Sequence, residues 1–170
     1  MRVFTIGHGA RSSEELLECL VEAGVRTLVD VRRFPGSRRH PQFGREAVAA
    51  TVREAGIEYV HAEPLGGRRS GGEQFGCIRV AAFRGYAQWM GGEVFQAALA
   101  EALALPVPCF MCAETLWWRC HRRLIAELLA ARGRDVVHLL RPGHSEPHRQ
   151  WEPVAEWRDG RLYLCGELVA

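Results

Sequence analysis

The sequence predicts a single α/β domain with a mainly parallel open sheet, helices on both faces and a small C-terminal hairpin. Three helix-like stretches each end at a glycine and are followed within a few residues by a short apolar run, at residues 27–31, 57–60 and 136–140. This alternation is typical of βα units, in which helices connect parallel strands. The 170 residues, 48% of them hydrophobic, suffice for one compact domain, and no internal repeat indicates a second one.

The first predicted element is a buried strand at residues 3–6, which stops at a tight turn containing His8. Ser12 and Glu15 form a capping box. In such a box the hydroxyl accepts from one free helix N–H and the carboxylate reaches back to another, so we expect a helix to begin there. Gly24 is placed to end this helix, and a second strand follows.

The middle of the chain predicts further helices and one long loop. Helices are expected at residues 46–55, 83–90 and 93–105. Residues 65–76 contain five glycines and predict a surface loop, and loops of that length are more often functional or mobile than filler. Residues 1–141 form the predicted core, and residues 142–170 form a loop and a hairpin that turns at Asp159 and Gly160.

The stretch at residues 108–133 is the most typical of a functional site. It predicts a buried strand that runs into a polar turn at residues 112–114. An amphipathic helix carrying Cys120 and His121 should follow and end at Gly133. The rest of the chain is expected to bring more polar side chains to that turn.

The composition excludes some classes of protein and favours anion binding. No run of about 18 apolar residues occurs, so no membrane span is expected. The start lacks the apolar stretch of a signal peptide, so we expect a cytoplasmic protein whose six cysteines are reduced thiols. The net charge of +2 does not indicate nucleic-acid binding, but all 22 basic residues are arginines, which suit phosphate and carboxylate groups. Coding bias or a heat-adapted source also explains that usage.

Several polar residues follow directly after the predicted strands. Because the carboxyl ends of parallel strands meet at one edge of the sheet, where α/β proteins bind ligands, these residues should lie close together. They are His8, Asp30, Arg32, Arg33, His61, Glu63, Cys112 and Glu114, with His138 or Arg141 as further members. Any one of these residues alone is ordinary for a loop. Acids, histidines, arginines and a thiol together at one edge of the sheet predict a functional site.

Cys112 and Glu114 are the main candidates for chemistry. A thiol at a strand end, before a helix N-terminus and near arginines, is favoured as thiolate, so Cys112 is a candidate nucleophile; the alternative is a buried core cysteine. Glu114 is either a general acid or base or the cap of the next helix. His8 is a weaker candidate. No glycine lies between Cys112 and Arg119, so the stretch does not match the phosphate-binding loop of cysteine phosphatases.

His121 falls on the apolar stripe of its predicted helix and should face inward, where a buried polar group needs a partner. We expect a structural hydrogen bond that ties the helix to the sheet. The helical wheel turns three arginines toward solvent, namely Arg119, Arg122 and Arg123. Cys120, His121 and Arg122 are therefore expected to have structural or supporting roles.

Arginines cluster between residues 26 and 45, against the single acid Asp30. The candidate substrate-binding or anion-binding residues there are Asp30, Arg32, Arg33, Ser37 and Arg38. Guanidinium groups bind phosphates, and a serine adds a hydroxyl donor. Phe34 and Phe43 are candidates for stacking on bases. The alternative is a solvated basic loop.

No cofactor is predicted, and zinc in particular is not expected. Cys109 and Cys112 form C-x-x-C, but residues three apart in a strand point to opposite faces of the sheet. A site made of Cys112, Cys120 and His121 would require the helix to start later than predicted.

Five motifs, in order along the chain, resemble the family known as domain of unknown function 488: TIGHG at 5–9, DVRRFPGSR at 30–38, LGG at 65–67, FRGYAQWM at 83–90 and CAETLWWRCHRRLIA at 112–126. The resemblance spans roughly residues 3–140 and implies an α/β domain but no activity. The signature residues that it implies are His8, Asp30, Arg32, Pro35, Ser37, Cys112, Glu114, Cys120, His121 and Arg122. The tail from His144 onward lies outside the resemblance.

The leading hypothesis is a cytoplasmic enzyme that binds a phosphorylated, nucleotide or nucleic-acid substrate. The clustered arginines would hold the anionic groups, and Cys112, Glu114 and His8 would supply the chemistry. One alternative is a non-catalytic nucleic-acid or phosphate-binding module, and another is an interaction domain whose edge cysteines and histidines only pack. No membrane partner is expected, and the sequence leaves the oligomeric state open.

Overall fold

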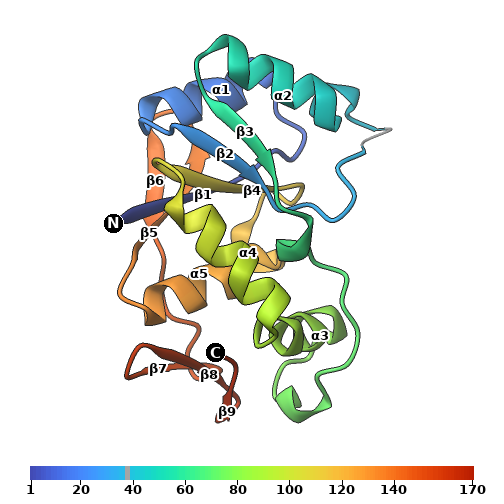
Figure 1. Cartoon of the computed structure of the whole chain (residues 1–170), viewed down its shortest axis with the longest axis vertical. Helices are drawn as coiled ribbons and strands as arrows, with labels where there is room; N and C mark the ends of the chain where they lie inside the picture. The colour runs from blue at the N-terminus through green and yellow to red at the C-terminus, as the bar shows by residue number, and fades with distance from the viewer. Residues whose placement is uncertain (37–38) are drawn as a thin grey trace.

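The computed structural model describes residues 1–36 and 39–170, so Ser37 and Arg38 lie outside the described residues. A six-stranded sheet has the strand order β3-β2-β4-β1-β5-β6 (Figure 1). Its strands are β1 (Arg2–Gly7), β2 (Thr27–Asp30), β3 (Glu58–His61), β4 (Pro108–Cys112), β5 (Asp135–Arg141) and β6 (His144–Pro147). The pairs among β1 to β5 are parallel, and β6 runs antiparallel to β5. The mainly parallel sheet predicted from the sequence is confirmed.

Helices cover both faces of this sheet, as predicted. They are α1 (Ser13–Glu22), α2 (Arg45–Glu54), α3 (Ala81–Met90), α4 (Glu93–Ala104) and α5 (Arg122–Ala131). The Ser12 side chain accepts from the Glu15 N–H at 3.1 Å, so α1 begins at the predicted cap. Every residue of β2 and β4 is buried, as expected for central parallel strands with both faces covered. None of the helices in the described chain is long and apolar enough to cross a membrane.

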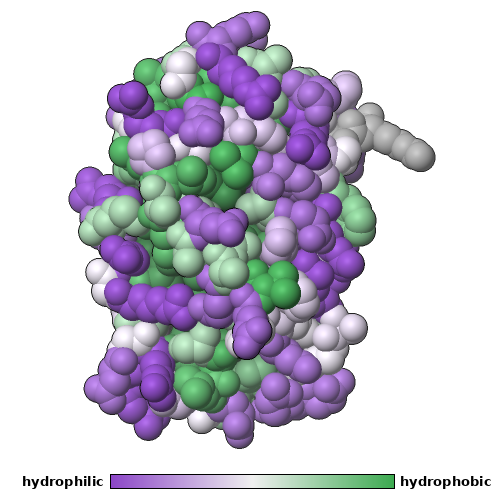
Figure 2. Space-filling view, viewed as in Figure 1, coloured by the Kyte–Doolittle hydropathy of each residue, from purple (hydrophilic) through white to green (hydrophobic). Residues whose placement is uncertain are grey.

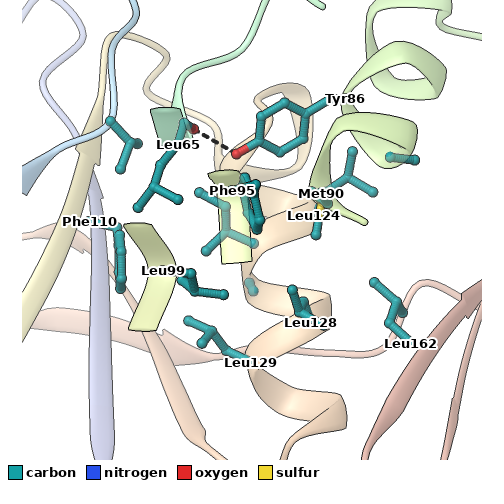
Figure 3. Packing of buried hydrophobic residues seen from close by; sticks show 14 of the residues in the cluster. Leu65, Tyr86, Met90, Phe95, Leu99, Phe110, Leu124, Leu128, Leu129 and Leu162 are labelled. Carbon is teal, nitrogen blue, oxygen red and sulfur yellow. Dashed lines mark hydrogen bonds between the residues drawn. The ribbon is translucent and has the colours of Figure 1, made fainter. Parts of the chain in front are cut away.

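Two hydrophobic cores lie on opposite faces of the sheet, because successive residues of a strand point to opposite sides. In β4, Cys109 and Met111 belong to the core under α1 and α2, whereas Phe110 and Cys112 belong to the core under α3, α4 and α5. Figure 3 shows the second core, in which the Tyr86 hydroxyl donates to the backbone oxygen of Leu65 at 2.6 Å. This bond ties α3 to the segment after β3.

The C-terminal residues of the chain form a small antiparallel sheet. It contains β7 (Ala155–Arg158), β8 (Arg161–Leu164) and β9 (Glu167–Leu168), and it lies beside α5 in Figure 1. Asp159 and Gly160 both have positive φ, as the predicted two-residue turn requires. A disulfide joins Cys77 to Cys165, so the expectation that all six cysteines are reduced is wrong. The two cysteines are 88 residues apart in sequence and meet because this small sheet packs back against the main domain.

The segment after β4 differs from the prediction. A 3-10 helix at Trp117–Arg119 comes first, Cys120 is extended, and α5 begins only at Arg122. The predicted helix containing Cys120 and His121 is therefore wrong. The physical reason is tertiary: the Trp117 ring stacks on the His138 ring at 4.1 Å, and this packing holds the chain in a separate turn.

Candidate functional site

Two neighbouring strands, β1 and β4, diverge at their carboxyl ends. The chain leaves β1 toward α1 on one face of the sheet and leaves β4 toward α5 on the other. Such a divergence is where open α/β sheets form a ligand crevice. The two exits stay side by side, because His8 N–H donates to Cys112 O at 3.0 Å and Gly9 N–H donates to Ala113 O at 2.9 Å. A Cβ at Gly7 would lie 1.8 Å from the backbone oxygen of Glu114, so only glycine permits this approach.

Two adjoining hollows open at this edge. The first, of about 190 Å³, is lined by Arg32, Arg33, Phe34, Gly67, Arg68, Cys112, Ala113, Glu114, Cys120 and His121. The second, of about 320 Å³, shares five of these residues and adds His8, Gly9, Gly36, His40 and Thr115. The structure thus brings together most of the residues expected at the edge. Ser37 and Arg38 are outside the part of the chain that it describes.

Other members of the expected set do not line these hollows. The His61 Nε2 donates to Arg32 O at 2.8 Å, and Glu63 lies within ion-pair distance of both Arg33 and Arg69. His138 is buried, and the Arg141 guanidinium donates to the His144 ring. Their contacts are therefore structural rather than directed at a ligand.

Two thiols and an imidazole form the floor of the first hollow. The acceptor and donor atoms of Cys112, Cys120 and His121 all lie within 4.8 Å of one another. The His121 Nε2 lies 3.1 Å from Val31 O, and because a carbonyl only accepts, this nitrogen carries the ring proton. The other nitrogen, Nδ1, therefore carries no proton. It lies 3.5 Å from the Cys120 sulfur and can accept a hydrogen bond from the Cys120 thiol. The bond to Val31 is the expected tie to the sheet, although it forms just before α5 rather than within it.

The thiol pKa values separate Cys120 from the other free cysteines. Burial raises the pKa of the Cys19, Cys109 and Cys112 thiols. Burial also raises that of Cys120, but hydrogen bonding with the Cys112 thiol, together with the charge and N–H groups of Arg122, outweighs it and lowers the pKa to about 7. Of these two neighbouring thiols, Cys120 is therefore the one whose pKa is lowered and Cys112 the one whose pKa is raised.

Arg122 provides the positive charge behind these thiols. It was expected to face solvent, and this is wrong: the side chain is 1% exposed, because the late start of α5 changes the phase of the helix. Its Nε donates to the Cys112 sulfur at 3.1 Å, and its other nitrogens donate to Thr5 Oγ1 and to the backbone oxygens of Glu114 and Thr115. None of these partners is a carboxylate. A buried cation needs an anionic partner, which a thiolate in the Cys112 and Cys120 pair supplies.

A buried hydrogen-bond chain supports Arg122 from behind. Because Arg122 donates to Thr5, the Thr5 hydroxyl is left to donate to His138 Nδ1, at 2.7 Å. The His138 Nε2 then faces His148 Nδ1 at 3.0 Å, and the His148 Nε2 lies 3.2 Å from a Glu127 carboxylate oxygen, at an angle poor for a hydrogen bond. Burial and the neighbouring His148 and Arg122 lower the pKa of His138 to about 2, so it is neutral.

Arg32 and His8 are held firmly at the edge. The Arg32 guanidinium binds the Asp30 carboxylate through Nε at 2.8 Å and Nη2 at 2.5 Å, and the Tyr59 hydroxyl donates to the same carboxylate. Its Nη1 donates to Phe43 O at 2.7 Å and lies 3.3 Å from His8 Nε2. Burial, partly offset by a bond to Gly9 O, lowers the pKa of His8 to about 4. Most donors of Arg32 are therefore already used, and it positions the site.

Arg33 and Arg68 are the arginines whose charge faces outward. Phe34, 63% exposed, has the Arg33 guanidinium 5.3 Å and the Arg68 guanidinium 6.0 Å from its ring centre. Arg68 makes no ion pair with any acid among the described residues, whereas Arg33 lies 3.3 Å from Glu63. Figure 2 shows hydrophilic residues predominating on the right-hand side of its view, where Figure 1 places the segments that leave β2 and β3.

Sequence reasoning missed Gly67 and Arg68. The five glycines of residues 65–76 indicated a functional loop. They did not indicate which part of the protein the loop would contact. A Cβ at Gly67 would lie 2.9 Å from the His121 Nδ1, so a glycine lets this segment close over the imidazole. That approach places Arg68 at the rim of both hollows.

Within the described residues, the same three side chains form a group that could hold a metal ion. A metal site made of Cys112, Cys120 and His121 requires the helix to start after His121, and α5 does start at Arg122. Two thiolates with one imidazole suit zinc. The Arg122 guanidinium, however, already lies within hydrogen-bond distance of one sulfur. This permanent charge opposes a divalent cation at the same place, so the contacts fit a thiolate better than a metal.

The fold and this edge define an α/β domain with a polar, thiol-containing crevice at the divergence of two central strands. The chain belongs to the family described as domain of unknown function DUF488, whose family model matches residues 12–129. That match includes every strand end around the hollows except that of β1. No curated protein and no solved structure matches the chain.

Proposed function

We propose that this protein is a cytoplasmic enzyme that acts on a phosphorylated, nucleotide or nucleic-acid substrate, with Cys120 as its reactive thiol. One observation carries the proposal: a thiol whose pKa is lowered to about 7 lines the same small hollow as Arg33 and Arg68. Perturbed ionisable groups in a crevice are typical of active sites. The disulfide is compatible with this location, since intracellular proteins of heat-adapted organisms carry disulfides.

The arginines would orient the anionic part of the substrate. Arg68 has no acidic partner in the described chain, and guanidinium groups bind phosphate oxygens through two parallel donors. Arg33 shares its charge with Glu63, so we assign it the weaker contact. Arg32 would act indirectly, because its bonds to Asp30, Phe43 and His8 fix the shape of the hollow.

The chemistry would begin with ionisation of Cys120. Burial lowers the pKa of His121, so its imidazole would stay neutral and the proton of Cys120 would pass to solvent, while Arg122 would stabilise the thiolate. The thiolate would form a bond to the electrophilic atom of the substrate while the bond to the leaving group breaks. Glu114 lines both hollows and is exposed, so it is placed for proton transfer. Cys112, first considered as the nucleophile, would donate a hydrogen bond to Cys120 instead.

Thiol alkylation and nucleotide binding test the proposal. Reaction with iodoacetamide, mapped by mass spectrometry, should modify Cys120 first, with a rate that rises as pH increases through about 7. Cys120→Ser should remove this reaction, and the matched control Cys19→Ser, in the opposite core, should keep it. Nucleoside monophosphate binding, measured by calorimetry, should weaken in Arg68→Ala and not in Arg134→Ala. Modification of Cys112, Cys19 or Cys109 before Cys120 would reject Cys120 as the reactive group.

A non-catalytic phosphate-binding or nucleic-acid-binding module is the second candidate. The exposed Phe34 ring, with two guanidinium groups near it, favours this candidate, because aromatic rings and arginines together bind bases and phosphates without chemistry. In that case Cys112→Ser and Cys120→Ser would leave binding unchanged and no substrate would be turned over. Arg68→Ala would still weaken binding and its salt dependence.

A further inference from the structure

A third and larger hollow lies against the site. It has a volume of about 620 Å³ and is lined by Cys77, Ile78, Arg79, Val80, Phe83, Glu114, Trp118, Arg119, Arg123, Trp151 and Val154. Glu114 lines this hollow and both of the hollows at the sheet edge. The proposed active site is therefore bordered by a space that the bound part of a small phosphorylated substrate would not fill.

The walls of this third hollow combine aromatic rings and arginines. Trp118 is 41% exposed, and the Phe83 and Trp151 rings meet edge to face with centres 6.2 Å apart. The Arg123 guanidinium lies 3.7 Å from the Trp151 ring centre, and its Nε is buried without a hydrogen-bond partner. Stacked aromatic and guanidinium planes of this kind bind nucleobases.

The positive charge of this hollow is only partly compensated. Arg79 and Arg119 are exposed, and neither forms an ion pair with an acid in the parts of the chain that the structure describes. Glu114 is the only acid in the lining of the hollow, against three arginines. The space thus complements a ligand that carries both flat apolar groups and several negative charges.

The same combination occurs on the other side of Glu114. There, Phe34 is exposed with Arg33 and Arg68 beside its ring. Two platforms, each with at least one aromatic ring and at least two arginines, therefore border Glu114. A mononucleotide has one base and would occupy one platform, whereas a strand of several nucleotides would occupy both.

We infer that the ligand of this protein is a single-stranded nucleic acid that crosses the sheet edge from Phe34 to Trp118 and Trp151, with its sugar-phosphate backbone at the arginines. The inference rests on the proposed function, of which it names the substrate class. A single strand is favoured over a duplex because a base can stack on the exposed Phe34 or Trp118 ring only when it is itself unstacked and unpaired. No base-specific contact is implied, since stacking accepts any base.

Fluorescence anisotropy with labelled oligo(dT) and oligo(U) of about 10 nucleotides tests this inference. Trp118→Ala should weaken binding by at least about fivefold, the lower end for loss of one stacked base. Arg119→Ala should weaken binding and reduce the slope of log K against log salt by about 0.7, the value for one phosphate contact on a single strand. The controls are Leu168→Ala, an exposed apolar residue of β9, and Arg134→Ala, which changes the charge equally at the opposite edge of the sheet. Both controls should bind as the unchanged protein does.

The outcomes separate this inference from the proposed function. If nucleoside monophosphates bind as tightly as the oligonucleotides, or if Trp118→Ala and Arg119→Ala behave like their controls, the inference is overturned while the proposed function stands. Equal affinity for a duplex of the same length also overturns it. If neither oligonucleotides nor mononucleotides bind, both proposals are overturned. A further comparison of oligo(dU) with oligo(U), which differ only in the 2′-hydroxyl, identifies the preferred sugar.

Discussion

The Cys120 thiol differs from the other free thiols in the groups around its sulfur. Arg122 contributes a backbone N–H at 3.5 Å and a buried charge, and Cys112 contributes a thiol proton. Cys109, by contrast, has a raised pKa in the opposite core. A few contacts therefore decide which cysteine is ionised, and each of them can be removed singly.

At the residue scale, we predict that Cys112→Ala raises the pKa of the Cys120 thiol above about 7, because the hydrogen bond from Cys112 stabilises the thiolate. The measurement is the pH dependence of iodoacetamide modification at Cys120. Cys112→Ser keeps a donor and should restore most of the effect, while Cys109→Ala should change nothing. An unchanged pH profile in Cys112→Ala would show that Cys112 does not support the thiolate.

His8 gives a second prediction at this scale. Its pKa is about 4 in the folded protein against an ordinary value of 6.5, mainly because it is buried. As pH falls from about 6.5 to 4, the unfolded chain takes up a proton that the folded chain does not, so the free energy of unfolding decreases. The loss should be at most about 3 kcal/mol and should level off below pH 4 for this residue. Urea denaturation at several pH values should show a smaller loss in His8→Gln, and an identical loss would contradict the assignment.

At the scale of elements, the C-terminal sheet is joined to the main domain by the Cys77–Cys165 disulfide. Cys77 also lines the third hollow, just before α3. We predict that Cys77→Ser together with Cys165→Ser lowers the free energy of unfolding by about 2–5 kcal/mol, because the bond closes a long loop in the unfolded chain. Thermal unfolding with and without a reductant measures this. A melting temperature insensitive to both the substitutions and the reductant would show that the bond contributes nothing.

Which elements the sequence could predict depends on whether local or tertiary forces set them. Helix, glycine and strand follow each other with local signals, so the parallel sheet and the meeting of His8, Arg32, Cys112 and Glu114 at one edge were predictable. The start of α5 was not predictable, because it depends on the stacking of Trp117 against His138, which lies in β5. Because the predicted start was wrong by a few residues, Arg122 was predicted to face solvent, whereas it lies in the core.

At the scale of the whole molecule, contacts between distant segments were also beyond prediction. The disulfide joins residues with no pattern that pairs them, and Arg68 reaches the site only because Gly67 allows its loop to approach His121. The pairing of β1 with β4, which are separated by more than half of the chain, sets the position of the crevice. Sequence periodicity identifies strands but not their neighbours.

Protection of Cys120 from alkylation by a bound nucleotide would show that the arginines and the thiol serve one ligand. The rate of Cys120 alkylation at neutral pH would be measured with and without a nucleoside monophosphate, in the unchanged protein, in Arg68→Ala and in the control Arg134→Ala. We expect strong protection in the unchanged protein and in Arg134→Ala, and little in Arg68→Ala. Equal alkylation of Cys120 with and without a saturating amount of bound nucleotide would contradict a shared site.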